Sequence, residues 1–354
     1  MCGIGFIANV DDRIEISQDL QGRIAAGLRN RGNNEITALK RHRHWFSASV
    51  LHIQGSIPAT QPHIDRDTGA ILLWNGEVFG GLEELDDISI SDTFIVSQHL
   101  SRILRTSPEY FLSEMVTFFA GIHGPFSFIY FLPELDAVFY GRDSFGRRSL
   151  LRLSDEQHEW FALSSCMTSL SPLPFSVHDT PTSTTLDAAE LWNEVPVDGL
   201  YMWSQRNPKV HRCCPWPSSR IQLGRIHVRK TERRILRYGN PTNAAVGFLH
   251  YLRAALKKRV RRVYSDQTEI AGTCSVGILF SGGIDSVLLA AVLHESVDAH
   301  LSIELMNVTF DEKDASMKNS SRSPSPDRLA AISALRELQV NLSIFLIRSF
   351  VFKQ

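Results

Sequence analysis

The chain has few cysteines, no long apolar stretch and almost no net charge. Its five cysteines are an odd number without a C-x-x-C pair, which argues against a disulfide framework and a structural zinc site. No segment approaches the roughly 20 apolar residues of a membrane-spanning helix. With 37 basic and 38 acidic residues, no overall charge draws the chain to nucleic acid or to a membrane surface. We therefore predict a protein of a reducing compartment, cytoplasmic in location, with the nucleus left open and no membrane partner.

A secretory signal is also missing from the start. The opening MCGIGFIANV has no basic residue before its apolar run, and Asp11 and Asp12 follow it directly. The length of 354 residues allows two domains, each with its own core. An apolar share of 43% and a charged share of 21% are typical of globular proteins.

Short β-branched and aromatic runs predict a strand-rich α/β domain over about the first 200 residues. These runs include AILLWNGEVF, GPFSFIYFL, AVFYGRD and EWFALSS, and Gly, Pro, Asn or Asp separate them. Helices are expected over 92–104 and 107–119. An earlier helix is indicated by Leu20, Ile24 and Leu28, which recur at helical spacing.

The remainder divides into an irregular part and a second α/β part. Prolines and polar residues collect over 171–245, which predicts an interdomain region with some strand content around Leu200–Trp203. The runs SVGILF, SGGIDS, VLLAAVLHES, IELMNVTF and PDRLAAISALREL then follow in the order strand, turn, helix, strand, helix. This order predicts the opening of a parallel α/β sheet.

Cys2 is the first candidate for chemistry. Methionine is usually removed when the second residue is small, and removal would give Cys2 a free α-amine. Such an amine titrates at about pH 8 and can accept the thiol proton, so one residue would supply both nucleophile and base. The alternative interpretation is a buried, inert cysteine in an edge strand.

Asn75, Gly76, Glu77 and Asp92 are candidates for the same chemistry. An Asn amide beside a Gly N–H can stabilise the oxyanion of an acyl-transfer reaction, although Asn-Gly is also the strongest signal for a tight hairpin turn. Asp92 stands where a helix is predicted to begin. It is either a helix cap or an anion that pairs with a substrate ammonium group.

Together with Arg31-Gly32, GRDSFGRRSL and FALSS, these stretches resemble the class II glutamine amidotransferase domain, whose members begin Met-Cys-Gly-Ile. The resemblance covers about the first 165 residues. It implies a four-layer αββα sandwich of the N-terminal-nucleophile hydrolase type that hydrolyses glutamine to glutamate and ammonia. By this resemblance Cys2 attacks the amide and Asn75 and Gly76 hold the oxyanion, while Asp92 binds the α-ammonium and Glu77 lines the glutamine site.

Two positions depart from that family. Asn33-Asn34 stands where members carry Pro-Asp, and Gln54 stands where members carry an arginine for the α-carboxylate of glutamine. Gln54 offers a neutral hydrogen bond in place of a charged fork. We therefore expect weaker glutamine binding unless a neighbour such as Arg66 reaches the site.

The segment SVGILFSGGIDSVLLAAVL carries the most specific motif. Two glycines bend the backbone and present N–H groups to an anion, and the helix that follows adds positive potential. The motif resembles the pyrophosphate loop of ATP-pyrophosphatases, which implies binding of ATP and magnesium by six consecutive residues: Ser281, Gly282, Gly283, Ile284, Asp285 and Ser286. The alternative is an ordinary glycine-rich turn between a strand and a helix. No set of side chains suggests a separate metal site.

A glutaminase followed by this loop is the layout of asparagine synthetase, a ligase in which ammonia reaches an aspartate adenylated by ATP. LWNGE, GRDSFGRRSL and EVPVDGL resemble most closely the asparagine synthetase domain-containing proteins, over nearly the whole chain to about Gln339. The predicted domains are therefore an amidotransferase domain over 2–185, an interdomain region over 186–245, a partial asparagine synthetase domain of ATP-pyrophosphatase type over 246–339 and a divergent tail over 340–354.

Two functions remain open. The first is a glutamine-dependent enzyme of asparagine biosynthesis, with glutamine, aspartate and ATP as substrates. The second is a catalytically impaired, truncated pseudoenzyme that acts as an interaction module, since asparagine synthetases continue beyond this point and half a parallel sheet leaves an edge unpaired. The basic clusters RIHVRKTERRILR and KKRVRR are better explained as solvated surface than as a nucleic-acid site. A homodimer is left open.

Overall fold

The computed structural model describes most of the chain as two compact units, Met1–Arg229 and Lys230–Gln354. The described residues are 1–9, 18–33, 35–55, 59–82, 89–155, 160–168, 192–217, 241–260, 276–297, 303–308, 325–342 and 350–353.

The first unit contains two six-stranded antiparallel sheets. One sheet has the order β10-β8-β9-β1-β3-β2, made of Asn193–Glu194, Leu151–Asp155, Trp160–Ser164, Gly3–Asn9, His44–Ser49 and Thr37–Arg41. The other has the order β12-β11-β7-β6-β5-β4, made of Asn207–Pro215, Gly199–Ser204, Ala137–Arg142, Phe126–Leu132, Ile71–Gly76 and His63–Ile64.

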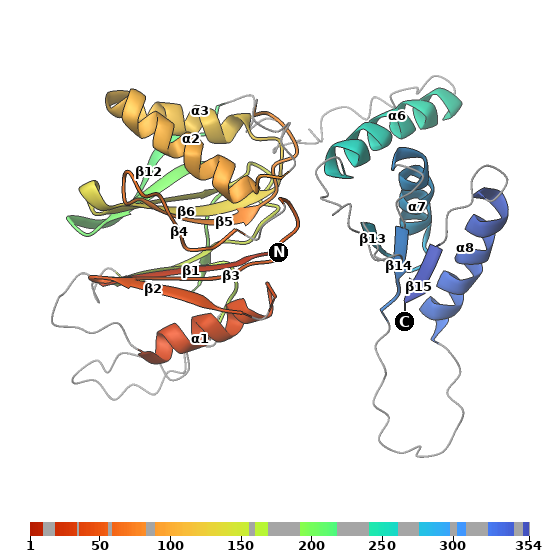
Figure 1. Ribbon diagram of the computed structural model, residues 1–354, viewed down its shortest axis with the longest axis horizontal. Coiled ribbons are helices and arrows are strands. Elements are labelled where there is room, and N and C mark those ends of the chain that lie inside the picture. The colour runs from red at the N-terminus through yellow and green to blue at the C-terminus, as the bar shows by residue number, and fades with distance from the viewer. Residues whose placement is uncertain are drawn as a thin grey trace, which may run out of the picture. The chain divides into compact units, whose positions relative to one another are not determined.

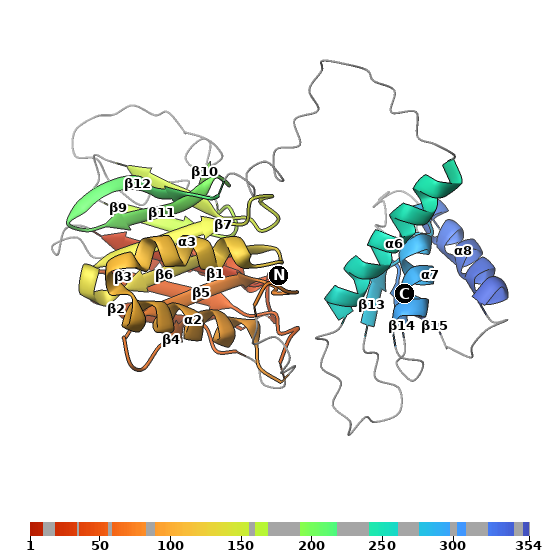
Figure 2. The same ribbon diagram turned by 90° about the horizontal axis from the view of Figure 1, so that it is seen from above.

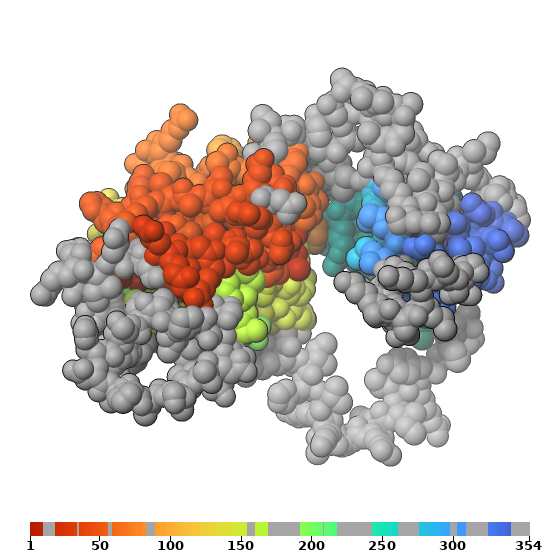
Figure 3. All heavy atoms as spheres, turned by 90° about the horizontal axis from the view of Figure 1, so that it is seen from below, coloured from red at the N-terminus to blue at the C-terminus, as the bar shows by residue number. Residues whose placement is uncertain are grey.

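Helices cover the outer face of each sheet. The helix α1 (Gln18–Arg29) packs on β1 and β3, and α2 (Asp92–Thr106) and α3 (Phe111–Gly121) pack on the other sheet. Figure 1 shows the four layers edge-on, Figure 2 looks onto α2 and α3, and Figure 3 shows the α1 side of this unit in red to orange. This arrangement agrees with the predicted αββα sandwich.

Alternate side chains of β1 pack into two different hydrophobic cores. Ile4 and Phe6 are fully buried between the two sheets, where the Phe6 and Phe46 rings lie 5.1 Å apart. Ile7 points to the opposite face and packs against α1 through Ile24 and its neighbours. Because successive residues of a strand face opposite sides, a fully buried strand of this kind reads as a continuous apolar run.

The predicted helices of the first unit are confirmed with small shifts. The helix α2 covers 92–106, and α3 follows a single 3₁₀ turn at Pro108–Tyr110, while a second 3₁₀ turn, Pro133–Leu135, joins β6 to β7. The predicted strand content around Leu200–Trp203 is β11. That strand pairs with β7 and β12, so the range predicted as an interdomain region contributes three strands to the first unit. The predicted boundary between 185 and 186 and the basic stretch at 225–237 lie outside the described residues.

The second unit is built on a three-stranded parallel sheet in the order β13-β14-β15, made of Val276–Leu279, Ile303–Met306 and Phe350–Lys353. The helices α6 (Pro241–Val260), α7 (Ile284–Ser296) and α8 (Pro326–Leu342) accompany it. Buried Ile278, Ala290, Leu305 and Leu338 join strands and helices in one core. The strand β15 comes from the predicted tail and adds to the sheet by pairing with β14. Among the helices of the described residues, none has the length and apolar character to cross a membrane.

Candidate active site

Cys2 lies directly before β1, beside the residues that follow β3. Gly3 pairs with Ser49, and the Cys2 Sγ accepts a hydrogen bond from the Leu51 N–H at 3.4 Å and donates to the Leu51 carbonyl at 3.7 Å. Ile4 and Phe6 face the space between the sheets, so alternation points Cys2 the same way. Burial raises the pKa of the Cys2 thiol, and the carboxylates of Asp92 and Glu77 act in the same direction. The thiol therefore needs a base to ionise it near neutral pH.

A small cavity beside Cys2 gathers five of the six residues predicted for this site. The cavity has a volume of about 20 Å³, which is room for about one water molecule. It is lined by Cys2, Gln54, Gly76, Glu77 and Asp92, together with Ala59, Gln61, Trp74, Ser91 and Thr93 and the segment from Val50 to Ile53. Asn75 does not line it. The predicted constellation is thus brought together, but in a closed form.

Asn75 and Gly76 are the last two residues of β5 and do not form a hairpin turn. They pair with Ser127 and Phe126 of β6. The Glu77 N–H bonds to the Pro125 carbonyl at 2.9 Å, so in an antiparallel ladder the N–H of Gly76 points to the opposite edge, which is the cavity side. A Cβ on Gly76 would lie 2.7 Å from the Trp74 ring. Glycine at this position therefore leaves its own N–H at the cavity wall and fits where a larger residue would not.

The side chain of Asn75 is fully buried behind this wall. Its Nδ2 donates to the Ser127 Oγ at 3.4 Å, and its Oδ1 has no hydrogen-bond partner. Ile71 and Leu73 of the same strand lie in the core between the sheets, so Asn75 and Cys2 project into the same layer by alternation. Within the described residues no hydrogen bond joins the two side chains. Asn75 and Cys2 therefore share the layer between the two sheets but are not directly bonded.

Gln54 and Glu77, which both line the cavity, are joined by a direct hydrogen bond. The Gln54 Nε2 donates to the Glu77 Oε2 at 2.5 Å, and Gln54 is only 5% exposed. Burial raises the pKa of Glu77 to about 7, and the nearby charge of Asp92 raises it further, while the Gln54 bond and Arg148 oppose the rise. The carboxyl of Glu77 is therefore close to half-protonated at neutral pH. The Gln54 Oε1 is buried without a partner.

Asp92 is the first residue of α2 and is 7% exposed. Ser91, not Asp92, is the helix cap, since the Ser91 Oγ accepts from the Phe94 N–H at 3.4 Å. The Asp92 carboxylate accepts from the Trp74 indole N–H at 3.1 Å and from the Thr93 N–H at 2.8 Å. The N-terminal end of the helix also favours its negative charge. A buried anion is thus held facing Cys2 and Glu77.

Gln61 is a positioning residue that the sequence patterns did not reveal. Its Oε1 accepts from the Trp74 N–H at 2.7 Å and its Nε2 donates to the Trp74 carbonyl at 3.0 Å, as a neighbouring strand would. Its Nε2 also lies 3.3 Å from the Thr93 Oγ1. The Gln61–Pro62 peptide is cis. One buried side chain therefore ties this loop to β5 and α2 around the cavity.

Arg148 is the arginine whose charge bears on the site. It lowers the pKa of Glu77, and burial lowers the pKa of Arg148 itself, against the opposing charges of Glu77 and Cys2. Its backbone is fixed by Arg142, whose Nε donates to the Arg148 carbonyl at 2.7 Å. Arg148 belongs to GRDSFGRRSL, so the motif was noticed in the sequence but not this residue.

Arg31 supports the start of β1. Its Nη1 donates to the Ser149 Oγ at 2.8 Å and to the Ser165 carbonyl, and its Nη2 lies 3.8 Å from the Met1 Sδ. The Ser165 Oγ accepts from the Ile4 N–H at 3.0 Å. The Arg31-Gly32 pair thus anchors the residues next to Cys2.

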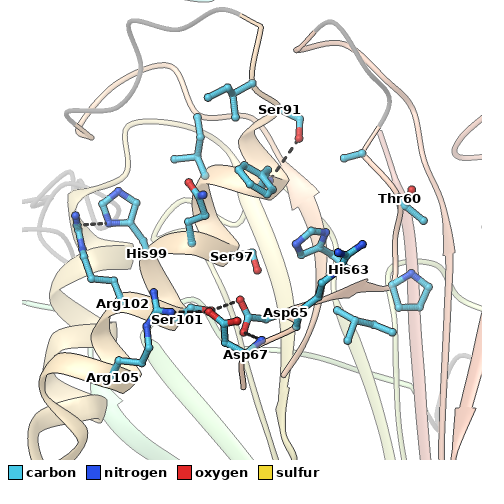
Figure 4. A pocket seen from close by; sticks show the side chains of 18 of the residues that line it. Thr60, His63, Asp65, Asp67, Ser91, Ser97, His99, Ser101, Arg102 and Arg105 are labelled. Atoms are coloured by element: carbon cyan, nitrogen blue, oxygen red, sulfur yellow. Dashed lines mark hydrogen bonds and ion pairs between the residues drawn. The ribbon is translucent and has the colours of Figure 1, made fainter. Parts of the chain in front are cut away.

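Arg66, which was suggested as a substitute for the missing arginine, lies at a different cavity. That cavity has a volume of about 980 Å³ and lies between the turn after β4 and α2. Figure 4 shows polar side chains of its lining bonded to one another: Ser101 with Asp65 at 2.6 Å, Arg102 with His99 at 2.7 Å and Arg105 with Asp67 at 2.7 Å. It shares Ala59 and Ser91 with the Cys2 cavity, but Arg66 lines only the larger one.

The six predicted nucleotide-loop residues also come together, in the second unit. They follow β13 and open α7, as the strand–turn–helix pattern predicts. Gly282 has a φ of +78°, and a Cβ there would lie 2.5 Å from the backbone of Ala330 and Ala331. The Ser286 Oγ donates to the Gly283 carbonyl at 2.9 Å, and the Ser281 Oγ accepts from the Gly283 N–H at 3.3 Å. Ile284 and Asp285 are exposed.

The fold and the sites together define an α/β protein with a half-buried cysteine at the edge of a two-sheet sandwich and a glycine-rich strand-to-helix loop in a parallel α/β unit. The chain is a homologue of the asparagine synthetase domain-containing proteins. It is 28% identical over 389 residues to asparagine synthetase domain-containing protein 1 of Homo sapiens, covering 90% of this chain and 56% of that protein. The protein of the same name in Mus musculus is 25% identical over 441 residues, covering 96% of this chain and 66% of that protein.

The chain thus spans little more than half the length of the human relative that it matches. Among solved structures, the glutamine phosphoribosylpyrophosphate amidotransferase of B. subtilis aligns with a TM-score of 0.41 at 13% identity, covering 95% of this chain and 70% of that one. No protein-family model matches the chain.

Proposed function

We propose that the chain is a glutamine-dependent amidotransferase of asparagine synthetase type. In this proposal Cys2 hydrolyses glutamine in the first unit, an N-terminal-nucleophile glutaminase. The ammonia passes to an aspartate that the second unit activates with ATP. The observation that carries the proposal is the convergence of Cys2, Gly76, Glu77 and Asp92 on one cavity, although they come from three separate places in the chain.

The first step uses Cys2 after removal of Met1. The free α-amine takes the thiol proton, and the sulfur attacks the side-chain amide carbon of glutamine while the carbonyl electron pair moves to oxygen. The N–H of Gly76 and the amide of Asn75 stabilise this oxyanion. When the oxyanion collapses, the C–N bond breaks and the proton held by the α-amine leaves with the nitrogen as ammonia. Cys2 is left as a thioester.

The second step releases glutamate. The neutral α-amine takes a proton from a water molecule, whose oxygen adds to the thioester carbon. Collapse of this second oxyanion expels the Cys2 sulfur, which regains its proton. Asp92 pairs with the substrate α-ammonium throughout, and the buried anion at the start of α2 suits that role.

Substrate entry requires the cavity to open. About 20 Å³ is far smaller than the several hundred Å³ of ordinary ligand sites. The hydrogen bond between Gln54 and Glu77 bridges the cavity, so it must break for the glutamine side chain to reach Cys2. The substrate α-carboxylate then binds the Gln54 amide. The charge of Arg148 partly compensates for the absence of an arginine at position 54.

The loop from Ser281 to Ser286 fits the phosphates of ATP. Gly282 adopts a conformation that other residues disfavour, and a Cβ there would strike α8. The loop lies between the end of β13 and the first turn of α7, where backbone N–H groups and the positive end of a helix can bind phosphate. Asp285 is exposed and would hold magnesium together with the phosphates. Bound ATP would supply the adenylate that makes the aspartate carboxyl reactive toward ammonia.

A second candidate function is an interaction module without turnover. The closed cavity and the neutral Gln54 favour it. Glutamate release separates the two functions. We expect protein that lacks Met1 by intact mass to release glutamate from glutamine, and Cys2→Ala to lower the rate at least 1000-fold because the nucleophile is gone. Cys166→Ala is the matched thiol control, since the Cys166 Sγ lies near Ser164 and away from the cavity. No release above blank by the wild-type protein would support the interaction module.

A further inference from the structure

Three turns of the first unit meet in a basic cavity at the other end of the sandwich from Cys2. The cavity has a volume of about 840 Å³. It is formed by the β2–β3 turn at 41–44, the β6–β7 turn at 133–136 and the β11–β12 turn at 205–206. His44 pairs with Ala8 at the far end of β1, so six residues of strand, roughly 20 Å, separate this end from Cys2.

The lining of this cavity is strongly cationic. It contains three arginines, two histidines and a single acid: Arg41, Arg43, Arg206, His42, His44 and Asp136. His42 and Arg206 are exposed, and their side chains make no hydrogen bond to any residue in the described part of the chain. The cavity of Figure 4 differs in this respect, because its arginines at 102 and 105 are already bonded to protein groups.

A buried polar group without a partner marks the floor of the cavity. His44 is 3% exposed, and its Nε2 has no hydrogen bond although the Asp136 Oδ1 lies 3.6 Å away. Its ring packs against Phe131 at 4.6 Å. An unsatisfied buried nitrogen is costly in a folded protein, and a residue that lines the cavity holds a polar atom that no protein group satisfies.

The backbone is strained at the same place. Among the described residues, His42 and Asp136 are the only ones other than glycine with positive φ, each at +47°, and both line this cavity. Such conformations cost free energy and gather at functional sites. The two turns therefore hold unfavourable conformations where the basic groups meet.

We propose that this cavity binds a small organic phosphate ester. The guanidinium of Arg206 and the ring of His42 offer free donors to phosphoryl oxygens, and the Nε2 of His44 lies at the floor. The volume exceeds that of a single phosphate and lies in the range of small-molecule sites. Phe131 and Pro133 supply an apolar wall for the organic part. No residue of the Cys2 cavity takes part, so the proposal does not depend on glutamine hydrolysis.

Calorimetric titration of the full-length protein with inorganic phosphate and with AMP tests the proposal. We expect both to bind at low ionic strength, with AMP tighter because of the apolar wall. Arg206→Gln should weaken AMP binding about tenfold or more, and His42→Asn, which tolerates positive φ, should weaken it further. Arg105→Gln removes the same charge from the other cavity and should leave the affinity unchanged.

Two outcomes would overturn the proposal. One is that millimolar AMP gives no binding heat to wild-type protein. The other is that AMP binds equally to wild type and Arg206→Gln, which would place it at another site such as the Ser281–Ser286 loop. Unchanged thermal midpoints of both variants confirm that they are folded, as expected for substitutions of exposed side chains.

Discussion

Glu77 is a buried carboxyl group whose charge sets the electrostatics of the cavity beside Cys2. Burial raises its pKa from 4.5 to about 7, helped by the nearby Asp92. The folded state therefore holds a proton on Glu77 between about pH 4.5 and 7 that the unfolded chain has already lost. Over that window the stability contributed by this group falls as the pH rises.

Glu77→Gln should remove this pH dependence. The amide keeps the shape of the protonated acid and can still accept from Gln54. Up to about pH 4.5 the variant and wild type should have the same free energy of unfolding. As the pH rises to 7 the variant should become the more stable, by at most about 3 kcal/mol. Urea unfolding at a series of pH values measures this gap. Glu134→Gln, at an exposed glutamate, should show no such trend, and a gap independent of pH would contradict the assignment.

The sequence predicted which residues surround Cys2 better than it predicted how they interact. Gln54 was recognised as a departure from the family pattern, but its partner Glu77 is 23 residues away and only the folded chain shows the bond. Asn75-Gly76 looked like a turn because the local signal is strong, yet pairing with β6 keeps both residues in a strand. Gln61 has no motif, because its role consists of hydrogen bonds to the backbone of Trp74.

The loop between β13 and α7 shows the opposite case, in which local sequence determines local structure. Two adjacent glycines after an apolar strand predict a tight turn, and the structure places the turn there with Gly282 at positive φ. The second unit also contains a glycine in a helix, which can be compared with Gly282. Gly247 lies inside α6, and a Cβ there would meet nothing within 4 Å.

Alanine at these two glycines should therefore have opposite effects. Gly282→Ala forces an unfavourable φ and a clash with α8, and should destabilise the second unit by about 1–3 kcal/mol. Gly247→Ala should stabilise it by about 0.5–1 kcal/mol through helix propensity. All six tryptophans precede residue 217, so fluorescence reports the first unit. The stability of the second unit is measured by hydrogen exchange of peptides from α7 and α8. Equal exchange rates in the two variants would contradict this account.

Elements that depend on distant partners were harder to predict. Prolines and polar residues over 171–245 suggested a linker with some strand content at β11, but β12 was not predicted, and it is held by pairing with β11. The strand β15 lies in a tail without a recognisable pattern and forms by pairing with β14. The basic cavity joins turns near residues 42, 135 and 205, and no sequence window contains all three.

In the proposed function, each of the two units carries one of the two sites that the reaction needs. The first contains the cavity lined by Cys2, Gly76 and the carboxyl group of Asp92. The second contains a phosphate-type loop at the end of a parallel strand. If the proposed function holds, the two sites are chemically independent and linked only by the ammonia that one releases and the other consumes.

Variants at the two sites should therefore fail in different assays. Cys2→Ala should lose glutamate release and glutamine-supported AMP formation, yet keep AMP formation from ATP, aspartate and added ammonium. Asp285→Asn should keep glutamate release and lose AMP formation with either nitrogen source, because the magnesium-bound phosphates lose a ligand. Asp327→Asn, at an exposed acid in the first turn of α8, is the control for charge loss in the same unit.

Loss of ammonium-supported AMP formation in Cys2→Ala would show that the sites are not independent. Glutamate release without any AMP formation by wild type would restrict this chain to glutamine hydrolysis, because the first step needs only the first unit.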